Sequence, residues 1–268
     1  MSPIGPIRWG VLRAGSYFDM PEVCIASPAL PEHFDGFRIA LLADLHLGLL
    51  VKPGFLRAAL GRLCAAEPDL ILLCGDLTER PDESIDILVG HLRPVCSRFN
   101  TIAVMGNHDY WCGREFFCRQ LAAAGVDMVI NEHRLIRRRG NPRAAGVAIL
   151  GLDDYVFGSP DFAAAAAGIE NGTFTILAAH HPDQADDLPA DAAVDLMLCG
   201  HTHGGQVCLF GMHLATCVKN RNYVAGRTRG PGFPMYISRG LGCVTVPLRI
   251  NADPELPIII LRRGEIRE

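Results

Sequence analysis

Runs of β-forming residues recur along the chain, and each ends in polar side chains suited to metal binding. Five such runs are IALLAD (39–44), LILLCGD (70–76), TIAVMGNHD (101–109), FTILAAH (174–180) and DLMLCGHTH (195–203). A short apolar run of this kind predicts a buried strand. Open α/β sheets build their sites at the carboxyl ends of their strands, so the polar residues are expected to meet at one edge.

Between these runs the pattern changes to that of amphipathic helices. Pro53 opens the segment FLRAALGRLCAA, which ends before Pro68. Further helices are expected over about 82–97, 113–124 and 162–167. This alternation of strand and helix predicts parallel strands joined by right-handed crossovers.

The later part of the chain is richer in β-formers. The segments MVINEHRLI (128–136) and VAILGLDD (147–154) flank an arginine-rich stretch and predict a hairpin. From residue 205 onward QVCLF, residues 212–218, PMYISRG and LPIIILRR are mostly β. Two β-rich halves with helices predict an α/β fold, a four-layer αββα sandwich of two mixed sheets flanked by helices.

Composition narrows the class of protein. Of the 268 residues 49% are apolar and the net charge is −4, which fits one large domain and argues against an electrostatic nucleic-acid binder. No run approaches the ~18 uninterrupted apolar residues of a membrane span, and the N-terminus has no signal-like core. Ten cysteines without a C-x-x-C pair favour reduced thiols, so a cytoplasmic location is expected. We expect one domain over residues 1–268, with a core of about 35–263 and a lead-in strand and loops over 1–34.

The polar blocks suggest which metals can bind. They are Asp44-Leu45-His46, Gly75-Asp76, Gly106-Asn107-His108-Asp109, His180 and Gly200-His201-Thr202-His203. Carboxylate, imidazole and amide ligands without a thiolate suit Mn²⁺, Fe or Zn²⁺. There are too many ligands for one tetrahedral ion, and about enough for two ions that share a carboxylate.

In this order the blocks read D-x-H, G-D, G-N-H-[DE], H and G-H-x-H, and the chain resembles the calcineurin-like metallophosphoesterases. The resemblance implies a first divalent ion, with Mn²⁺ expected before Fe or Zn²⁺, held by Asp44, His46, Asp76 and His203. It implies a second ion held by Asp76, Asn107, His180 and His201, with Asp76 as the bridge. A hydroxide between the ions would be the nucleophile.

The same resemblance assigns roles beside the metals. His108 would lie next to the substrate and protonate the leaving oxygen, and Asp109 would orient its ring. Of the adjacent His180 and His181, the pattern H-x-P-D makes His180 the ligand, and strand alternation points His181 elsewhere.

Other polar residues near these blocks have simpler interpretations. Cys74 and Cys199 lie inside apolar runs and are interpreted as small buried hydrophobic residues rather than ligands. Asp153 and Asp154 are expected to cap a loop or lie behind the ligands, with substrate contact as the alternative.

Within the family the resemblance is to a bacterial branch. It rests on G-H-T-H-G-G-Q at 200–206 and S-R-G-L-G at 238–242. The branch includes envelope phosphodiesterases and UDP-2,3-diacylglucosamine pyrophosphatases of lipid A synthesis. The GDxVDRG block of the serine/threonine phosphatases is not matched, and the branch's C-P-P-E block is Ala252-Asp253-Pro254-Glu255 here. Arg239, within S-R-G-L-G, is the expected phosphate-binding arginine.

The expected function is hydrolysis of a phosphodiester or pyrophosphate bond, on a lipid or envelope precursor such as UDP-2,3-diacylglucosamine. The alternatives are a nucleotidase or broad phosphomonoesterase, and a scaffold that keeps the fold without catalysis. The expected partner is the phosphoester substrate, without nucleic acid. Arg137, Arg138, Arg139 and Arg143 form either a solvated hairpin tip or a peripheral contact with the inner face of a membrane.

Overall fold

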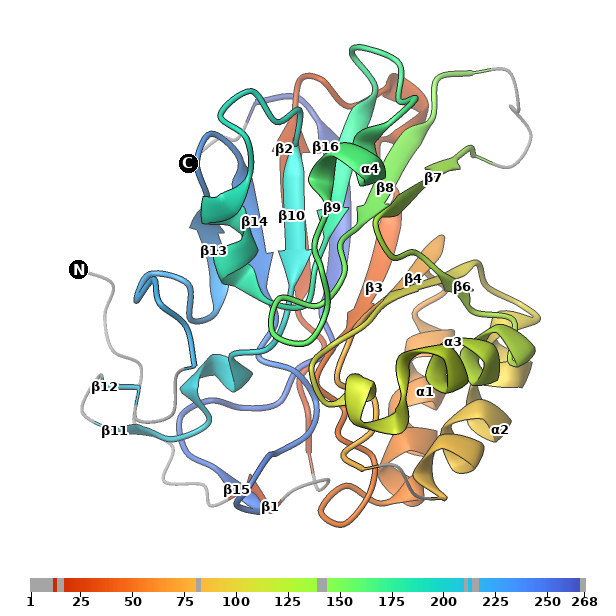
Figure 1. The fold of residues 1–268 in the computed structure, drawn as a ribbon, viewed down its shortest axis with the longest axis vertical. Coiled ribbons are helices and arrows are strands. Elements are labelled where there is room, and N and C mark those ends of the chain that lie inside the picture. The colour runs from red at the N-terminus through yellow and green to blue at the C-terminus, as the bar shows by residue number, and fades with distance from the viewer. Residues whose placement is uncertain are drawn as a thin grey trace.

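Two six-stranded sheets stacked face to face form the centre of the molecule (Figure 1). The computed structural model describes residues 12–13, 17–80, 83–138, 144–209, 212–213 and 217–265. The first sheet has the strand order β2 (Glu22–Ser27), β16 (Ile258–Arg263), β3 (Arg38–Leu42), β4 (Leu70–Cys74), β5 (Thr101–Val104) and β6 (Asp127–Met128). Only the β16–β3 pair is antiparallel.

The second sheet is also mixed, but its antiparallel pairs lie at its edges. Its order is β13 (Gly226–Arg229), β14 (Pro234–Ile237), β10 (Leu196–Cys199), β9 (Phe174–Ala178), β8 (Val147–Gly151) and β7 (Glu132–Ile136). The inner pairs are parallel and the two outer pairs, β13–β14 and β7–β8, are antiparallel. Two short ladders lie outside the sheets, β1 (Leu12–Arg13) with β15 (Leu248–Arg249) and β11 (Cys208–Leu209) with β12 (Met212–His213).

Helices cover the outer faces of the sandwich. Figure 1 shows α1 (Pro53–Ala65), α2 (Ser84–Cys96) and α3 (Arg114–Ala123) grouped beside β3 and β4, and α4 (Phe162–Ala166) over β8 and β9. Four 3₁₀ turns complete the described elements, η1 (Glu32–Phe34), η2 (Asp109–Cys112), η3 (Pro182–Asp187) and η4 (His203–Gly205). These layers confirm the predicted αββα sandwich.

The strand period of two divides the core into three parts. In β4, Ile71 and Leu73 pack under the helices, whereas Leu70, Leu72 and Cys74 pack between the sheets. Because both faces of this strand are covered, it reads as a continuous apolar run rather than an alternating one. The third part lies between the second sheet and α4.

The predicted helices and the hairpin of β7 with β8 are confirmed, but one strand prediction is wrong. The run 128–136 is not a single strand, because β6 belongs to the first sheet and β7 to the second. Asn131, with φ 55°, lies where the chain crosses between the sheets. A local apolar pattern cannot tell which of two stacked sheets a residue joins, since both bury it.

A strand near the start of the described chain and one near its end are neighbours in the first sheet. The strand expected within the lead-in is β2, and it pairs with β16 along its whole length. None of the described helices is both long enough and apolar enough to cross a membrane.

The arginine-rich hairpin tip is only partly described. Arg139 and Arg143 lie outside the described residues. Arg137 donates a hydrogen bond to the Ala144 carbonyl, and Arg138 donates to the carbonyls of His33 and Asp35. Both guanidinium groups therefore bind backbone carbonyls of the protein itself.

Leu72→Ala tests the position of β4 between two covered faces. The substitution is expected to lower the free energy of unfolding by about 2–5 kcal/mol, because it leaves a cavity between the sheets. Leu135, on β7 and 43% exposed, is a matched control whose change to alanine should cost less than about 0.5 kcal/mol. Urea denaturation measures both, and equal losses would contradict the assigned packing.

Candidate metal centre

Strands of both sheets end at one edge of the sandwich, and each is followed by predicted ligands. In chain order β3 precedes Asp44 and His46, β4 precedes Asp76, β5 precedes Asn107, β9 precedes His180, and β10 precedes His201 and His203. The first three strands belong to one sheet and the last two to the other. The candidate centre therefore lies across the seam between the sheets.

The backbone is unusual where these side chains leave the strands. Among the described residues, ten that are not glycine have positive φ, and half of them are predicted ligands, namely Asp44, His46, Asp76, His201 and His203. The left-handed region is costly for residues with a Cβ. Such strain persists only where the surroundings fix it, and it tends to gather at functional sites.

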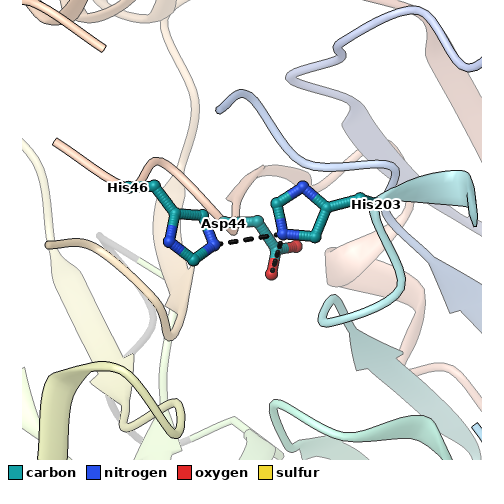
Figure 2. Close-up of side chains that lie close together, drawn as sticks. All are labelled: Asp44, His46 and His203. Carbon is teal, nitrogen blue, oxygen red and sulfur yellow. Dashed lines mark hydrogen bonds and ion pairs between the residues drawn. The ribbon is translucent and has the colours of Figure 1, made fainter. Parts of the chain in front are cut away.

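One group of possible ligands combines both sheets. Figure 2 shows Asp44, His46 and His203 turned toward a common point. Nε2 of His203 lies 3.1 Å from Nε2 of His46 and 3.7 Å from Oδ1 of Asp44. All three residues are at least 95% buried, so the side chains face one another rather than solvent.

A second group shares the neighbourhood of Asp76. Oδ2 of Asp76 lies 3.3 Å from Nε2 of His180, and that nitrogen lies 3.2 Å from Nδ1 of His201. Oδ2 of Asp76 is also 3.5 Å from Nε2 of His46, which links this group to the first. Asp76 therefore lies between the two groups, where a bridging carboxylate would have to be.

Asn107, directly before His108 in the turn after β5, has an unsatisfied oxygen. Its Oδ1 is buried and has no hydrogen-bond partner among the described residues. A buried polar atom without a partner is costly, so its presence asks for an explanation. An amide oxygen facing a cation would be satisfied, and Asn107 therefore fits the predicted ligand set.

The hydrogen bonds of His46 and His180 favour ligation through Nε2. Nδ1 of His180 lies 2.7 Å from the Cys74 carbonyl, and Nδ1 of His46 lies 2.7 Å from Glu79 Oε2. Each acceptor places the proton of a neutral ring on Nδ1, because a carbonyl or carboxylate cannot donate. Each Nε2 then carries a lone pair directed into the cluster, as in histidine metal ligands.

His203 differs in this respect. Its Nδ1 lies 3.1 Å from Nη2 of Arg249, and a guanidinium nitrogen can only donate. This contact places the proton of a neutral His203 ring on Nε2. Ligation through Nε2 requires the contact to be given up, and Nη2 of Arg249 also donates to the Gly242 carbonyl.

Burial makes the charges of the cluster interdependent. Burial raises the pKa of Asp44 to about 6. Burial alone would raise the pKa of Asp76 too, but the facing His180 holds it well below its usual range. Burial alone would lower the pKa of His180, and the ion pair with Asp76 instead raises it to about 10. Asp76 thus requires positive charge beside it, and a divalent cation would meet that requirement.

Two glycines of the blocks are needed for close packing against the carboxylates. A Cβ at Gly106 would lie 2.3 Å from Oδ1 of Asp76, and one at Gly200 would lie 2.5 Å from Oδ2 of Asp44. Any side chain at either position would displace a predicted ligand. The glycines before Asn107 and His201 are therefore part of the site.

His108 lies at the outer side of the cluster. Its ring packs edge-on against His46, with 4.7 Å between the centroids, and its side chain is 12% exposed. Nδ1 of His108 lies 3.6 Å from Oε2 of Glu79, which is longer than a hydrogen bond. Burial lowers the pKa of His108 below its ordinary value.

The expectation that Asp109 orients the ring of His108 is wrong. The buried carboxylate of Asp109 accepts hydrogen bonds from the backbone N–H groups of Asp76, Leu77 and Gly106, at 2.8–3.0 Å. Asp109 therefore ties the turn after β4 to the turn after β5. A carboxylate directly after His108 points into these turns because their backbone donors would otherwise be buried and unpaired.

Glu79 is the carboxylate near His108, and the sequence analysis missed it. It joins His46 and approaches His108 from the turn that carries Asp76. The available signal was an acidic residue three positions after Asp76.

Arg239 is near the cluster but already paired. Its Nε and Nη2 donate to Oε2 of the buried Glu255, and its stem lies over Gly204 beside His203. Two of its N–H donors are therefore committed within the protein. Its role in phosphate binding stays a prediction.

The remaining polar residues behave as loop supports or core. Asp154 accepts from the backbone N–H groups of Val156 and Phe157, which is the expected capping of a loop. The ring of His181 packs against that of His201, with 4.0 Å between the centroids, and belongs to none of the possible metal-binding groups of the described residues. Cys74 and Cys199 are buried and also lie outside these groups.

Comparison with known proteins gives a family for residues 37–205, more than half of the chain, which match the family model described as calcineurin-like phosphoesterase. An uncharacterized metallophosphoesterase of Bacillus subtilis, YkuE, is 30% identical over 96% of this chain and 94% of its own length. The phosphodiesterase YaeI of Escherichia coli is 32% identical, over 84% of this chain and 82% of its own length.

Other similar proteins are longer or more distant. The chain spans about 60% of the length of several further curated relatives, among them metallophosphoesterases of Helicobacter pylori. Among solved structures, the NAD nucleotidase of Haemophilus influenzae is 17% identical and has a TM-score of 0.49, with 77% of this chain and 45% of that chain covered.

Asp109→Ala tests whether the Asp109 carboxylate holds together the turns after β4 and β5. The loss of one buried acceptor leaves three backbone donors unpaired, and each typically costs about 1–3 kcal/mol. We therefore expect a clear fall in thermal stability, together with weaker binding of divalent metal measured by calorimetry. Asp161→Ala is the control, because Asp161 accepts one N–H at the exposed start of α4 and should cost only about 0.5–2 kcal/mol. If Asp109→Ala binds metal with the affinity of the unsubstituted protein, the hydrogen bonds of Asp109 are not needed to position the metal ligands.

Proposed function

This chain belongs to the calcineurin-like phosphoesterases and is a metal-dependent phosphoester hydrolase, and we propose that it cleaves a phosphodiester or pyrophosphate bond with two divalent ions. The observation that carries the proposal is the position of Asp76. Asp76 belongs to two of the three groups of possible ligands found among the described residues, one with His46 and His108 and one with His180 and His201. Through His46 it also adjoins the group of Asp44 and His203. That arrangement suits a pair of ions better than one.

The ligand roles proposed for the chain follow the two groups. The first ion would be held by Asp44, His46, Asp76 and His203, and the second by Asp76, Asn107, His180 and His201. Mn²⁺ is the proposed metal, since a mixed oxygen and imidazole set suits it, with Fe or Zn²⁺ as alternatives. When bound, two such ions would neutralise phosphate charge and ionise water near neutral pH.

The protein's own groups would supply orientation and a proton. His108 borders the first group of ligands, so a phosphate at the metals would bring its leaving oxygen beside this ring. We assign His108 the role of general acid. Glu79 would set the tautomer of His46 and lie near His108, and Asp109 would keep both turns in register.

The substrate class is proposed from what the chain lacks and what it resembles. It lacks the serine/threonine phosphatase block, and a relative of similar length is named a phosphodiesterase. We therefore propose a diester or pyrophosphate, with a lipid precursor such as UDP-2,3-diacylglucosamine as the specific candidate. Ten cysteines without a C-x-x-C pair favour a reducing compartment, so such a substrate would be met from the cytoplasmic face of the membrane.

Elemental analysis and kinetics of four variants separate the metal ligands from the general acid. After Mn²⁺ reconstitution the protein should hold two ions per chain, and Asp76→Asn should weaken both, because its charge faces each group. His108→Ala should keep both ions and lose turnover by about 10²–10⁴-fold. His91→Ala, on α2, is the matched histidine control and should change neither. If His108→Ala loses metal and His180→Ala does not, the assigned roles are reversed.

A hydrolysis screen tests the substrate class. With Mn²⁺ supplied, bis-(p-nitrophenyl) phosphate or UDP-2,3-diacylglucosamine should be cleaved with a higher kcat/KM than phosphoserine peptides or nucleoside monophosphates. Mn²⁺ should support faster turnover than Mg²⁺, because imidazole ligands suit the softer ion. Efficient cleavage of monoesters alone would favour the nucleotidase or broad monoesterase instead. A protein that binds metal but cleaves no phosphoester would favour a scaffold.

A further inference from the structure

Large apolar side chains are exposed beside the candidate centre. Trp111, Val156 and Phe157 are 49%, 55% and 52% exposed, and we call these three residues the apolar rim. Trp111 follows His108 within η2, and the other two follow Asp154 in the loop between β8 and α4. Both segments come directly after strands that end at the site edge (Figure 1).

The ring of His108 lies between Trp111 and the predicted metal ligand His46. The indole packs against His108 with 4.1 Å between ring centroids, and His108 in turn packs against His46 at 4.7 Å. The backbone N–H of Trp111 donates to the His108 carbonyl, which fixes the turn that carries both rings. The exposed indole therefore has a defined position next to the proposed acid.

The loop that carries Val156 and Phe157 is fastened to the same turn. The hydroxyl of Tyr110 donates to Oδ1 of Asp153, and the rings of Tyr110 and Phe157 lie 6.4 Å apart. Since Tyr110 and Trp111 are neighbours in η2, the two segments of the rim lie side by side.

A buried charge holds the tip of this loop. Asp154 is fully buried, and one of its oxygens accepts both backbone N–H groups of Val156 and Phe157. Its burial raises its pKa, which reflects the cost of placing a carboxylate there. A costly buried carboxylate thus supports a loop tip on which two apolar side chains stay about half exposed to solvent.

We propose that the apolar rim binds an apolar group carried by the substrate, next to the phosphate at the candidate centre. The substrate class is then a phosphoester of a large apolar alcohol. This inference rests on the proposed function, because the phosphate must lie at the metals for its substituent to reach the rim. A leaving oxygen beside His108 has the indole of Trp111 along its path to solvent, so the attached group contacts the rim.

The gain in affinity from burying an apolar group on the rim is large enough to measure. Each methylene group fully removed from water contributes about 0.8 kcal/mol, or roughly a fourfold change in affinity, and a half-covered one contributes about twofold. A chain of several methylenes therefore gives a steep dependence of affinity on length. A polar pocket would give no dependence of affinity on chain length.

The experiment measures binding of n-alkylphosphonates with two to eight carbons, which cannot be cleaved as esters. Calorimetry on the Mn²⁺-loaded protein should show the Kd falling by about two- to fourfold per added methylene. The chain has two tryptophans, so a Trp9→Phe protein reports Trp111 alone, and its fluorescence should shift on binding of the longer probes. Phe157→Ser and Trp111→Ser should each flatten the dependence on length.

Leu135→Ser is the matched control, because Leu135 is similarly exposed but lies on β7 outside the rim, and it should keep the full dependence. An affinity independent of chain length, or a dependence that survives both rim substitutions, would overturn the proposal. Hydrolysis of di-n-alkyl phosphates is scored separately. Length-dependent binding without any hydrolysis would contradict the proposed function and support binding at the apolar rim. Hydrolysis with length-independent binding would support the proposed function and contradict binding at the rim.

Discussion

The buried carboxylate of Asp76 imposes the main constraint on this structure, because an ionised group removed from water must be faced by donors or positive charge. The first sheet supplies the carboxylate at the end of β4, and the second sheet supplies His180 at the end of β9. The turns of the first sheet give Asp76 the N–H of His108 and the more distant ring of His46, and the second sheet adds the ion pair with His180. The stacking that buries the core between the sheets also brings the charged cluster together at its edge.

Two further buried charges keep the turns around this cluster in place. Asp109 collects backbone donors from the turns after β4 and β5. Arg249, fully buried, donates to the carbonyls of Gly242, His203 and Ala252. The Gly242 segment in turn donates to the Asp44 carbonyl. An anion fixes the side nearest His108 and a cation fixes the side nearest His203, which explains how several left-handed residues persist in one small region.

The surroundings of the cluster change in character with distance from it. Its centre consists of carboxylates and imidazoles that are almost fully buried, whereas its outer side carries exposed aromatic and aliphatic residues. A polar centre next to an apolar rim suits a molecule with both parts, a phosphate and a hydrophobic substituent. The metal ligands would contact only the phosphate, so membership of the family does not indicate which group the phosphate carries. The apolar rim is what favours a hydrophobic substituent.

Local patterns in the sequence predicted most of the strands and helices, because apolar runs and helical periodicity depend on neighbouring residues alone. The family resemblance then predicted the ligands, each of which follows its own strand. The sequence by itself did not determine that residues 128–136 divide between two sheets, since both sheets bury the same apolar pattern. Nor did it determine which carboxylate approaches His108. Asp109 is adjacent in sequence yet turns to unpaired backbone donors, and Glu79 reaches the ring from another turn. Those orientations depend on which groups are left buried and unsatisfied after the sheets pack, and only the tertiary structure decides that.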